Sequence, residues 1–552
     1  MSLNNCFLYT KNDVMGLTGS ILHGYAITDN SIIINTEGLS LYEQKKPLIA
    51  PPEEGRFCGI FNVGKKFVVK SDTHGQDIVY VFRDGRGGWA ISNSFLMLTL
   101  YASRHGKVNF YQPAALGFFL KNGTHVGEQL ISHRTMIEEI EILPVNQEMH
   151  IDKITGELVF VSSSFTDFFK LNSVDYEDTI VSMLSKQMSI FDAIANTGQD
   201  IYLSLSGGYD SRLVLGMLSR KLIDTKKIFI KSDVNRNKDF VIAQKLCDTL
   251  GFDLNTYKSP RRALSLSVSE AYRSFLFSCC GTYLPVYPVR SHSLNPTPIL
   301  RLTGDYAADA SFFKGKSIFN GNMSKVGKDM SLFLQGRSGA EQAIRDFNDT
   351  FDVLGIDIDD PLSSAAYYCA IRSRHHCGRQ WYKTMGNDYL MTPLMNKGFT
   401  QLNLLNYSEG RREDELFTDL YCSMGNWATE IPFESAKGNL DENLVKNSKF
   451  RGGVALDHIK YDVYGSFSTH NEDSVSILDI PTRFKFDDAD FVANLRHEFL
   501  QIDKKMHLDI FNPEDLNRIQ GEIDNSGKLS HEYRGVTHML YVDLIRRITC
   551  EH

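Results

Sequence analysis

The first 160 residues alternate short apolar runs with polar turn residues, a pattern that predicts strands. Four of these runs stand out, at Ala26–Ile34, Cys58–Val69, Ile78–Phe82 and Gly88–Ser92, and Gly, Asp and Asn residues separate them. A polar stretch over residues 162–167 follows. We therefore expect a β-rich unit that ends near residue 165.

The period of the pattern changes after this point. Ile180, Leu184, Met188 and Phe191 recur at helical spacing. Short apolar strands are then predicted at 201–205, 227–231 and 298–302, with helices at 211–220 and 240–250 after the first two. Such alternation predicts a parallel sheet whose ligands bind at the carboxyl ends of the strands. Beyond about residue 335 the pattern is mostly helical.

The segment 206–211 reads Ser-Gly-Gly-Tyr-Asp-Ser and joins the first of these strands to its helix. Unpaired N–H groups at a helix start attract anions, and the two glycines let the backbone approach a phosphate closely. The serine hydroxyls add donors, and the aspartate suits the divalent cation that accompanies a polyphosphate. An ordinary glycine-rich turn is the alternative interpretation.

Composition narrows the function classes. The chain has 552 residues, 42% of them hydrophobic, and a net charge of −8. It is long enough for two or more domains, and its acidic balance argues against nucleic-acid binding as its main role. No apolar run approaches the roughly 20 residues that span a bilayer. The N-terminus lacks a signal-peptide pattern, and the nine cysteines form no Cys-x-x-Cys pair. We expect a reduced, cytoplasmic protein without membrane attachment.

The segment 206–211 resembles the pyrophosphate-binding loop of the ATP pyrophosphatase superfamily, as carried by asparagine synthetases, β-lactam synthetases and lasso-peptide cyclases. It is not a Walker loop, because no Gly-Lys-Ser/Thr ends it. The N-terminal part resembles the glutaminase domain of the same proteins, over Gly55–Phe61, Asp72–Tyr80, Trp89–Ser92 and Ile140–Asp152. The resemblance implies an α+β Ntn-hydrolase-like sandwich over 1–165. An α/β parallel-sheet ATP pyrophosphatase domain with a helical C-terminal part would follow over 166–552.

The N-terminus departs from the glutaminase pattern. Active members expose a cysteine after removal of the initiator Met, and its thiolate attacks glutamine. Here position 2 is Ser2, followed by Leu3, and Cys6 lies deeper in the chain without the surrounding signature. We therefore expect an inactive glutaminase domain that survives as a scaffold.

The segment 303–309 reads Thr-Gly-Asp-Tyr-Ala-Ala-Asp and resembles the second ATP loop of the family, a Ser-Gly-acid-Gly-Ala-Asp-Glu pattern. Ala308 stands where the family carries a metal-binding Asp, so Asp305 or Asp309 would join Asp210 on Mg²⁺. A plain strand-end turn is the alternative. The resemblance assigns ATP binding to Ser204, Ser206, Gly207, Gly208, Asp210, Ser211, Ile230, Thr303 and Gly304.

Family members also use a late lysine to neutralise the pentavalent phosphorus transition state, and Lys449 and Lys460 are the candidates here. Asp239 stands where the family has an acid opening a helix, although an acid there also complements the helix dipole. The segment 372–379 is a basic cluster with two adjacent histidines. It would either bind a substrate anion or form a solvated face, and its spacing does not fit zinc. Segments 391–396 and 431–433 resemble the helical half of synthetase domains.

The resemblance implies an ATP- and Mg²⁺-dependent ligase that adenylates a carboxylate and passes the acyl group to an amine. The substrates would be small molecules or peptides, and the amine could be intramolecular. Tyr209 and Arg212 differ from the residues common in asparagine synthetases, which favours natural-product or surface-polysaccharide tailoring. A homodimer or a biosynthetic partner protein is compatible with this role. The alternatives are a non-catalytic nucleotide- or partner-binding homologue, an asparagine synthetase and a nucleotide-modifying enzyme with the same loop.

Overall fold

A computed structural model gives the fold of the protein. It describes residues 2–3, 6–28, 30–120, 126–219, 227–256, 262–265, 276, 279, 281–282, 291–294, 298–307, 322–379, 388–412, 414–434, 440–468, 475–476, 517, 521 and 534–550.

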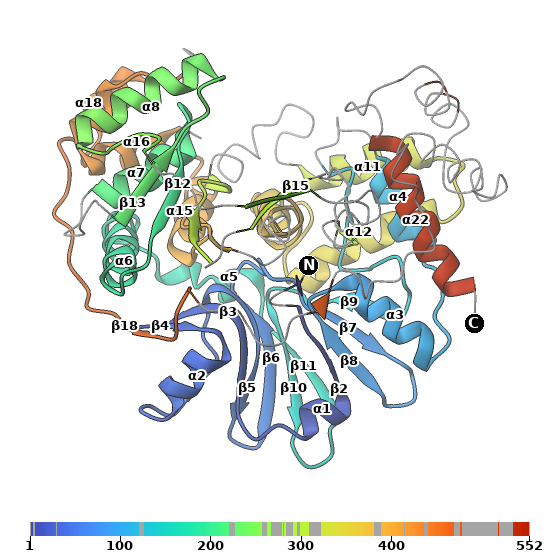
Figure 1. Ribbon diagram of the computed structural model, residues 1–552. Helices are drawn as coiled ribbons and strands as arrows, with labels where there is room; N and C mark the ends of the chain where they lie inside the picture. Colours follow the sequence, from blue (N-terminus) through green and yellow to red (C-terminus); the bar gives the residue numbers. More distant parts are fainter. Residues whose placement is uncertain are drawn as a thin grey trace.

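A seven-stranded sheet forms the base of the molecule (Figure 1). Its neighbours pair antiparallel, except that β18 runs parallel to β4 at one edge. In spatial order the strands are β11 (Leu158–Ser162), β10 (Gln147–Asp152), β6 (Lys66–Ser71), β5 (Glu54–Val63), β3 (Ile21–Thr28), β4 (Ser31–Ile34) and β18 (Asp462–Tyr464). The runs predicted over 26–34 and 58–69 each correspond to two paired strands, β3 with β4 and β5 with β6.

A four-stranded antiparallel sheet packs against the first. Its order is β2 (Leu8–Thr10), β8 (Trp89–Ser92), β7 (Tyr80–Arg83) and β9 (Ile140–Ile142). One apolar cluster joins side chains of both sheets, including Ile60 and Met149 from the larger and Val81 and Ile91 from the smaller. Strands with one buried face thus make a sandwich.

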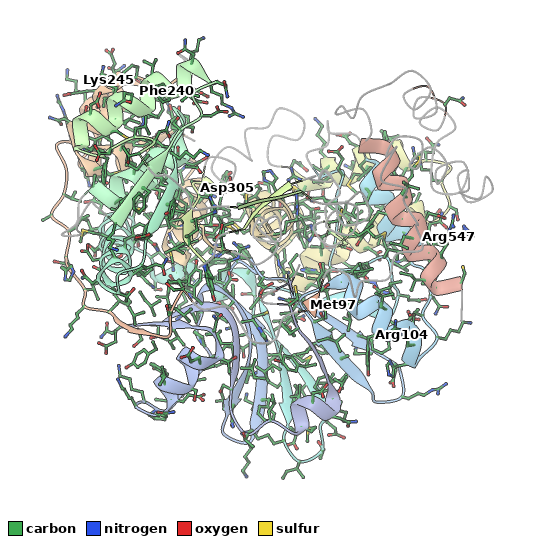
Figure 2. The ribbon with its side chains drawn as sticks, viewed as in Figure 1. Met97, Arg104, Phe240, Lys245, Asp305 and Arg547 are labelled. Atoms are coloured by element: carbon green, nitrogen blue, oxygen red, sulfur yellow. The ribbon has the colours of Figure 1, made fainter. Side chains whose placement is uncertain are left out.

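Helices cover the outer faces of this sandwich. Leu39 of α2 (Asn35–Glu43) packs on the larger sheet. The smaller sheet is covered by α3 (Phe95–His105), α4 (Gln112–Leu116) and the C-terminal helix α22 (Arg534–Cys550). Figure 2 shows Arg547 of α22 on the same side of the molecule as Arg104 of α3. The end of the chain therefore returns to the N-terminal sheets, as β18 does.

A four-stranded parallel sheet lies beyond the sandwich, in the order β13 (Ile228–Lys231), β12 (Ile201–Ser204), β16 (Leu300–Leu302) and β17 (Tyr389–Met391). Its helices include α6 (Tyr176–Asn196), α7 (Tyr209–Ser219) and α8 (Asn237–Leu250). The predicted alternation of strands and helices is confirmed. Segment 391–396, expected in a helical half, instead begins at the end of β17.

The rest of the described chain is mostly helical, which was expected for the part beyond about residue 335. Its helices are α1 (Lys11–Met15), α5 (Phe165–Phe168), α11 (Met323–Leu334), α12 (Ala340–Leu354), α13 (Ser363–Tyr367), α14 (Ser373–His376), α15 (Lys397–Ser408), α16 (Glu415–Met424), α17 (Asn426–Glu430) and α18 (Glu442–Asn447), with 3-10 turns at Gly117–Phe119 and Leu171–Ser173 and a π-turn at Tyr368–Arg372. Two further strand pairs join β1 (Ser2–Leu3) to β19 (Val475–Ser476) and β14 (Arg262–Ser265) to β15 (Ser291–Leu294).

An extended segment after α18 ties the parallel-sheet region to the sandwich. The main-chain N–H groups of Asp457 and Ile459 donate to the hydroxyls of Ser185 and Ser189 on α6, at 3.0 and 2.9 Å. Figure 1 shows this chain passing along the outer side of α6 before it enters β18. The domain boundary near residue 165 stays a prediction. Among the residues that the structure describes, no helix combines the length and the apolar composition needed to cross a bilayer.

Candidate functional site

The loop between β12 and α7 is built by its own two serines. The N–H of Ser206 donates to Ser211 Oγ at 3.0 Å, and the two hydroxyl oxygens lie 3.1 Å apart. The N–H of Gly208 donates to Ser206 Oγ at 3.3 Å. The helix that begins at Tyr209 therefore presents its first turn, with Asp210 in it, at the carboxyl edge of the parallel sheet.

One donor of this loop is already occupied. The N–H of Gly207 donates to Asp239 Oδ1 at 2.7 Å, and Asp239 lies in the first turn of α8. Glu434 contacts the same glycine, because its own N–H donates to the Gly207 carbonyl at 3.2 Å. A hydrogen bond between the two carboxyl groups lowers the pKa of Asp239 and raises that of Glu434. Of the two carboxyl groups, Asp239 is therefore the one that loses its proton more readily.

The second predicted loop meets the first at Gly304. A Cβ built on Gly304 would lie 2.4 Å from the Ser211 nitrogen and 2.8 Å from Asp210 Cβ. The turn after β16 therefore packs directly on the first turn of α7, and only a glycine permits this approach. Asp305 follows at once, with its N–H donating to Thr303 Oγ1 at 3.3 Å. Figure 2 places Asp305 on the side of the sheet that faces the centre of the molecule.

Tyr306 holds this turn in an unusual backbone conformation. Its φ is +95°, in the region that favours glycine. The ring is buried, and its hydroxyl lies 2.8 Å from Thr400 Oγ1 and 3.2 Å from Cys369 Sγ. His74 of the sandwich contacts the same ring edge-on at 5.4 Å. Such strain persists only where surrounding contacts enforce it, and it often marks functional sites.

Arg212 anchors the start of α7 to the segment 431–433. It is fully buried, and its guanidinium donates to the carbonyls of Ile431 and Pro432 at 2.6 and 2.8 Å. The same group stacks 3.8 Å from the ring centroid of Phe433, and burial lowers its pKa to about 10. This departure from the asparagine synthetase pattern therefore has a positioning role that links segment 431–433 to the loop.

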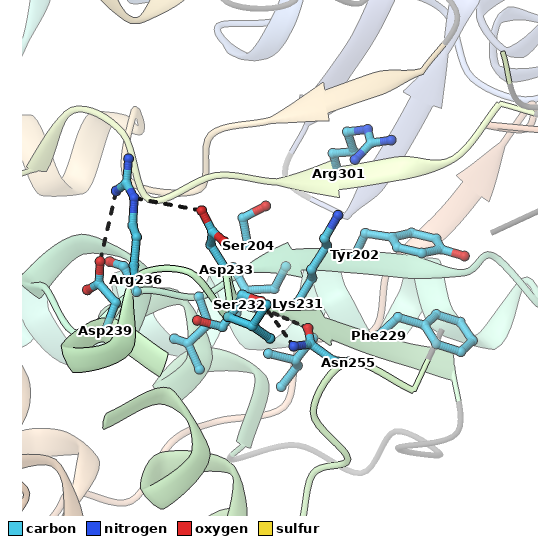
Figure 3. Close-up of a pocket in the computed structure, with 15 residues that line it drawn as sticks. Tyr202, Ser204, Phe229, Lys231, Ser232, Asp233, Arg236, Asp239, Asn255 and Arg301 are labelled. Atoms are coloured by element: carbon cyan, nitrogen blue, oxygen red, sulfur yellow. Dashed lines mark hydrogen bonds and ion pairs between the residues drawn. The ribbon is translucent and has the colours of Figure 1, made fainter. Parts of the chain in front are cut away.

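A cleft of about 740 Å³ opens beside the loop (Figure 3). This volume falls in the range of small-molecule sites. Side chains alternate along the strands that line the cleft. Those of Leu203 and Ile230 point into the core, and those of the residues next to them in the sequence point into the cleft. The lining residues are Tyr202, Leu203, Ser204, Leu205, Ser206, Phe229, Ile230, Lys231, Ser232, Asp233, Val234, Arg236, Asp239, Asn255 and Arg301.

Asn255 shapes one wall of the cleft. Its side chain accepts from the Ser232 N–H at 2.9 Å and donates to the Ser232 carbonyl at 3.0 Å. Arg236 lies 3.9 Å from both Asp233 and Asp239, and Figure 3 shows it bridging them. The exit from β13 is thus fixed by side-chain contacts next to the loop.

Sequence analysis missed Lys231 and Arg301, two of the three cationic residues that line this cleft. The alternation along the strands contained the signal. In strands that are otherwise apolar, Lys231 and Arg301 occupy positions whose side chains point to the same face of the sheet as that of Ser204. The structure brings together the predicted residues of the 204–211 loop, Thr303, Gly304 and Asp305. Ile230 is also among the residues that line the cleft, although its side chain packs in the core. Asp309 and Ala308 lie outside the described residues.

The two candidate lysines lie elsewhere. Lys449 forms an ion pair with Glu177 at the start of α6, in a separate cleft of about 480 Å³. Lys460 is exposed on the extended segment that follows α18. Neither lines the 740 Å³ cleft. Their catalytic role stays a prediction, and this placement gives it no support.

The basic segment 372–379 is not a solvated face, contrary to one of our two interpretations. Arg374, His375 and Arg379 are each 1% exposed. Arg374 Nε donates to the Gly75 carbonyl of the sandwich at 3.3 Å, and burial lowers the pKa of His375 well below its usual value. The Gly75 carbonyl comes from a distant part of the sequence, so sequence patterns do not reveal this contact.

The thiols of the sandwich are buried. Cys6 is 1% exposed, and Cys58 Sγ donates to Asp77 Oδ2 at 3.2 Å. Burial, together with the Asp77 charge, raises the pKa of Cys58 well above that of an ordinary thiol. The Cys58 sulfur is therefore held as a thiol rather than as a nucleophilic thiolate.

The acidic groups allow only a simple metal arrangement. Within the described ranges, no three His, Cys, Asp or Glu side chains come together around a common point. Mg²⁺ commonly takes one or two carboxylates and completes its shell with phosphate oxygens and water. Asp210 fits such a site, and Asp305 follows the glycine that packs against it.

Comparison with known proteins adds no relative. No protein-family model matches the chain, and no curated protein is significantly similar to it.

Proposed function

We propose that this protein is an ATP-dependent ligase that adenylates a carboxylate and transfers the acyl group to an amine, with release of AMP and pyrophosphate. The observation that carries the proposal is the packing of Gly304 on the first turn of α7. It unites two loops, 206–211 and 303–306, at the carboxyl edge of a parallel sheet. Ligands of open α/β sheets bind at this edge.

The finer fold assignment belongs to this proposal. The paired antiparallel sheets with outer helices are the arrangement that an Ntn-hydrolase-like domain implies, and the parallel sheet suits an ATP pyrophosphatase domain. Tyr306 gives independent support. In the Ser-Gly-acid-Gly-Ala-Asp-Glu pattern that segment 303–309 resembles, Tyr306 stands at the second glycine, and it has a glycine-like φ of +95°.

In this mechanism the loop at 206–211 would position the polyphosphate of ATP and stabilise the negative charge that develops on it. The N–H groups of the first turn of α7 and the hydroxyls of Ser206 and Ser211 would hold the β- and γ-phosphates as a unit. Mg²⁺ on Asp210 would offset the charge that develops as the pyrophosphate departs. A carboxylate in the cleft would attack the α-phosphorus in line, and the amine would then displace AMP.

Glutamine is not the nitrogen donor in this proposal. The burial of the Cys6 and Cys58 thiols speaks against a glutaminase step. The amine would therefore be free ammonia, a second substrate or a group of the same substrate.

A hydroxylamine trap tests this function. The protein is incubated with MgATP, hydroxylamine and a panel of carboxylic acids, and hydroxamate and nucleotide products are measured. The expected products are hydroxamate, AMP and pyrophosphate, lost in Asp210→Ala and retained in Asp248→Ala, which alters an exposed acid of α8. ADP as the main nucleotide product would contradict the mechanism.

A non-catalytic nucleotide-binding homologue is a second candidate. The hydrogen bond from Gly207 to Asp239 favours it, because a loop donor is satisfied by the protein itself. In that case MgATP would bind without any turnover across the panel.

A further inference from the structure

A chain of buried polar groups joins the turn after β16 to the N-terminal sandwich. The hydroxyl of Tyr306 lies 2.8 Å from Thr400 Oγ1, and the same threonine oxygen lies 2.7 Å from His74 Nε2. All three side chains are buried. Buried polar groups depend on such partners for their hydrogen bonds, so each member of the chain fixes the next one.

His74 is itself held by the turn that follows β6. Its N–H donates to Asp72 Oδ1 at 3.0 Å, and the N–H of Gln76 donates to Asp72 Oδ2 at the same distance. Thr400 lies on α15 and bridges this turn to Tyr306. The sandwich therefore reaches the edge of the parallel sheet through two side chains, those of His74 and Thr400.

The side chain at position 306 makes this anchor necessary. Tyr306 has a φ of +95°, and a residue with a Cβ stays in that region only where its contacts enforce it, whereas glycine adopts it freely. The ring meets His74 edge-on at 5.4 Å and Phe399 edge-on at 6.0 Å. These contacts hold the ring, and Thr400 holds its hydroxyl. The backbone of the turn thus depends on α15 and on the sandwich.

The strained residue adjoins a candidate metal ligand. Asp305 immediately precedes Tyr306, and Gly304 packs on the first turn of α7, which contains Asp210. A change in the backbone at 306 would therefore move the Asp305 carboxylate relative to Asp210. Mg²⁺ requires near-ideal geometry from its ligands, so such a change would weaken binding of the metal-bound nucleotide.

We propose that His74 and Thr400 are positioning residues for the nucleotide site: they hold Tyr306 in its strained conformation and thereby direct Asp305 toward the Mg²⁺ of MgATP. This inference rests on the proposed ligase function and gives the sandwich a part in nucleotide binding. Metal-free ATP does not use Asp305 in this scheme. The chain of contacts therefore acts on the preference for MgATP over ATP.

Four variants of the full-length protein test the proposal. Thr400→Val removes the hydroxyl that both partners share and keeps the shape of the side chain, whereas Thr400→Ser keeps the hydroxyl. Tyr306→Phe removes the other hydroxyl and keeps the ring, so it gives a second test if Thr400→Val does not fold. Thr350→Val is the matched control, because Thr350 is a buried threonine of α12 whose hydroxyl donates to the Asp346 carbonyl at 3.0 Å.

Two measurements are made on each variant. Hydrogen–deuterium exchange over residues 303–307 of the nucleotide-free protein should be about tenfold faster in Thr400→Val and Tyr306→Phe, because the turn opens more readily. Calorimetry gives the affinities for MgATP and for ATP with a chelator, and their ratio should fall at least about fivefold in the same two variants. Thr400→Ser and Thr350→Val should match the wild type in both measurements.

Unchanged exchange of the turn in Thr400→Val and Tyr306→Phe would overturn the inference, as would faster exchange with an unchanged ratio of affinities. Equal effects in Thr350→Val would also overturn it, because the role would then be one of general stability. A wild-type protein that binds neither form of ATP would contradict the ligase proposal. In that case the exchange data would still decide whether Thr400 holds the turn.

Discussion

The main-chain N–H of Gly207 donates to Asp239 Oδ1 at 2.7 Å. A phosphate that enters the loop must therefore compete with a resident carboxylate for this donor. A Cβ on Gly207 would lie 2.9 Å from Glu434 Cβ and 3.2 Å from Asp239 Oδ1, so both acids lie against this glycine. Access to the anion site is thus coupled to the charge of the Asp239–Glu434 pair.

Replacement of Asp239 should strengthen binding of metal-free ATP. Asp239→Asn keeps an oxygen acceptor for Gly207 but removes a negative charge beside the phosphates. We expect affinity to rise about tenfold at neutral pH, or about 1.4 kcal/mol, by calorimetry in the presence of a chelator. Asp248→Asn, on the exposed side of α8, serves as the control. Weaker or equal binding in Asp239→Asn would show that the carboxylate does not compete.

Glycine substitutions test the contact between the two loops. Gly304→Ala places a methyl group 2.4 Å from the Ser211 nitrogen, which is backbone and cannot yield easily. We expect MgATP affinity to fall at least about tenfold while the protein remains folded. Gly208→Ala meets only Ser206 Oγ, at 3.4 Å, and should lower the unfolding midpoint less than Gly304→Ala does. Equal midpoints and affinities in both variants would refute the packing described here.

Arg212→Lys should destabilise the protein. Lysine cannot reproduce the planar contacts with the carbonyls of Ile431 and Pro432 or the stacking on Phe433. Since buried carbonyls would lose their donors, we expect a loss of about 2–3 kcal/mol in the free energy of unfolding. Denaturant titration provides the measurement. A control is Arg345→Lys on the exposed side of α12, which should cost little. An unchanged midpoint for Arg212→Lys would mean that the clamp is dispensable.

Buried His74 predicts acid sensitivity. Burial lowers its pKa from 6.5 to about 3, while Nε2 contacts Thr400 Oγ1 at 2.7 Å. Because the folded pKa is depressed, the stabilising contribution is complete above pH 6.5 and declines as pH falls toward 3. Each unit of difference is worth about 1.4 kcal/mol. His74→Gln should therefore show a shallower fall in unfolding free energy over this range than wild type, whereas exposed His105→Gln should not.

Local patterns predicted the elements that form the site. The strand at 201–205, the loop and the helix after it are all visible in a single stretch, because strand alternation, glycines and helical spacing are local properties. The same holds for β13 and α8. Each of the two hairpins was predicted as a single strand run because few residues separate its two strands.

These local patterns could not predict contacts between residues that are far apart in the sequence. Arg212 meets partners more than 200 residues away, and Arg374 meets Gly75. A buried arginine looks like a surface arginine in sequence, because only the distant carbonyls compensate for its burial. Likewise, the pairing of Gly207 with Asp239 depends on how α8 docks, so Asp239 could be noted as a candidate but not given a partner.

Competition between pyrophosphate and ATP tests the central claim most directly, because both ligands must use the loop at 206–211. Calorimetry should show that the wild-type protein binds MgATP and that pyrophosphate displaces it competitively. Ser206→Ala with Ser211→Ala should weaken both ligands together. Binding of MgATP that pyrophosphate does not displace, or no binding of either ligand, would contradict the assignment of this loop.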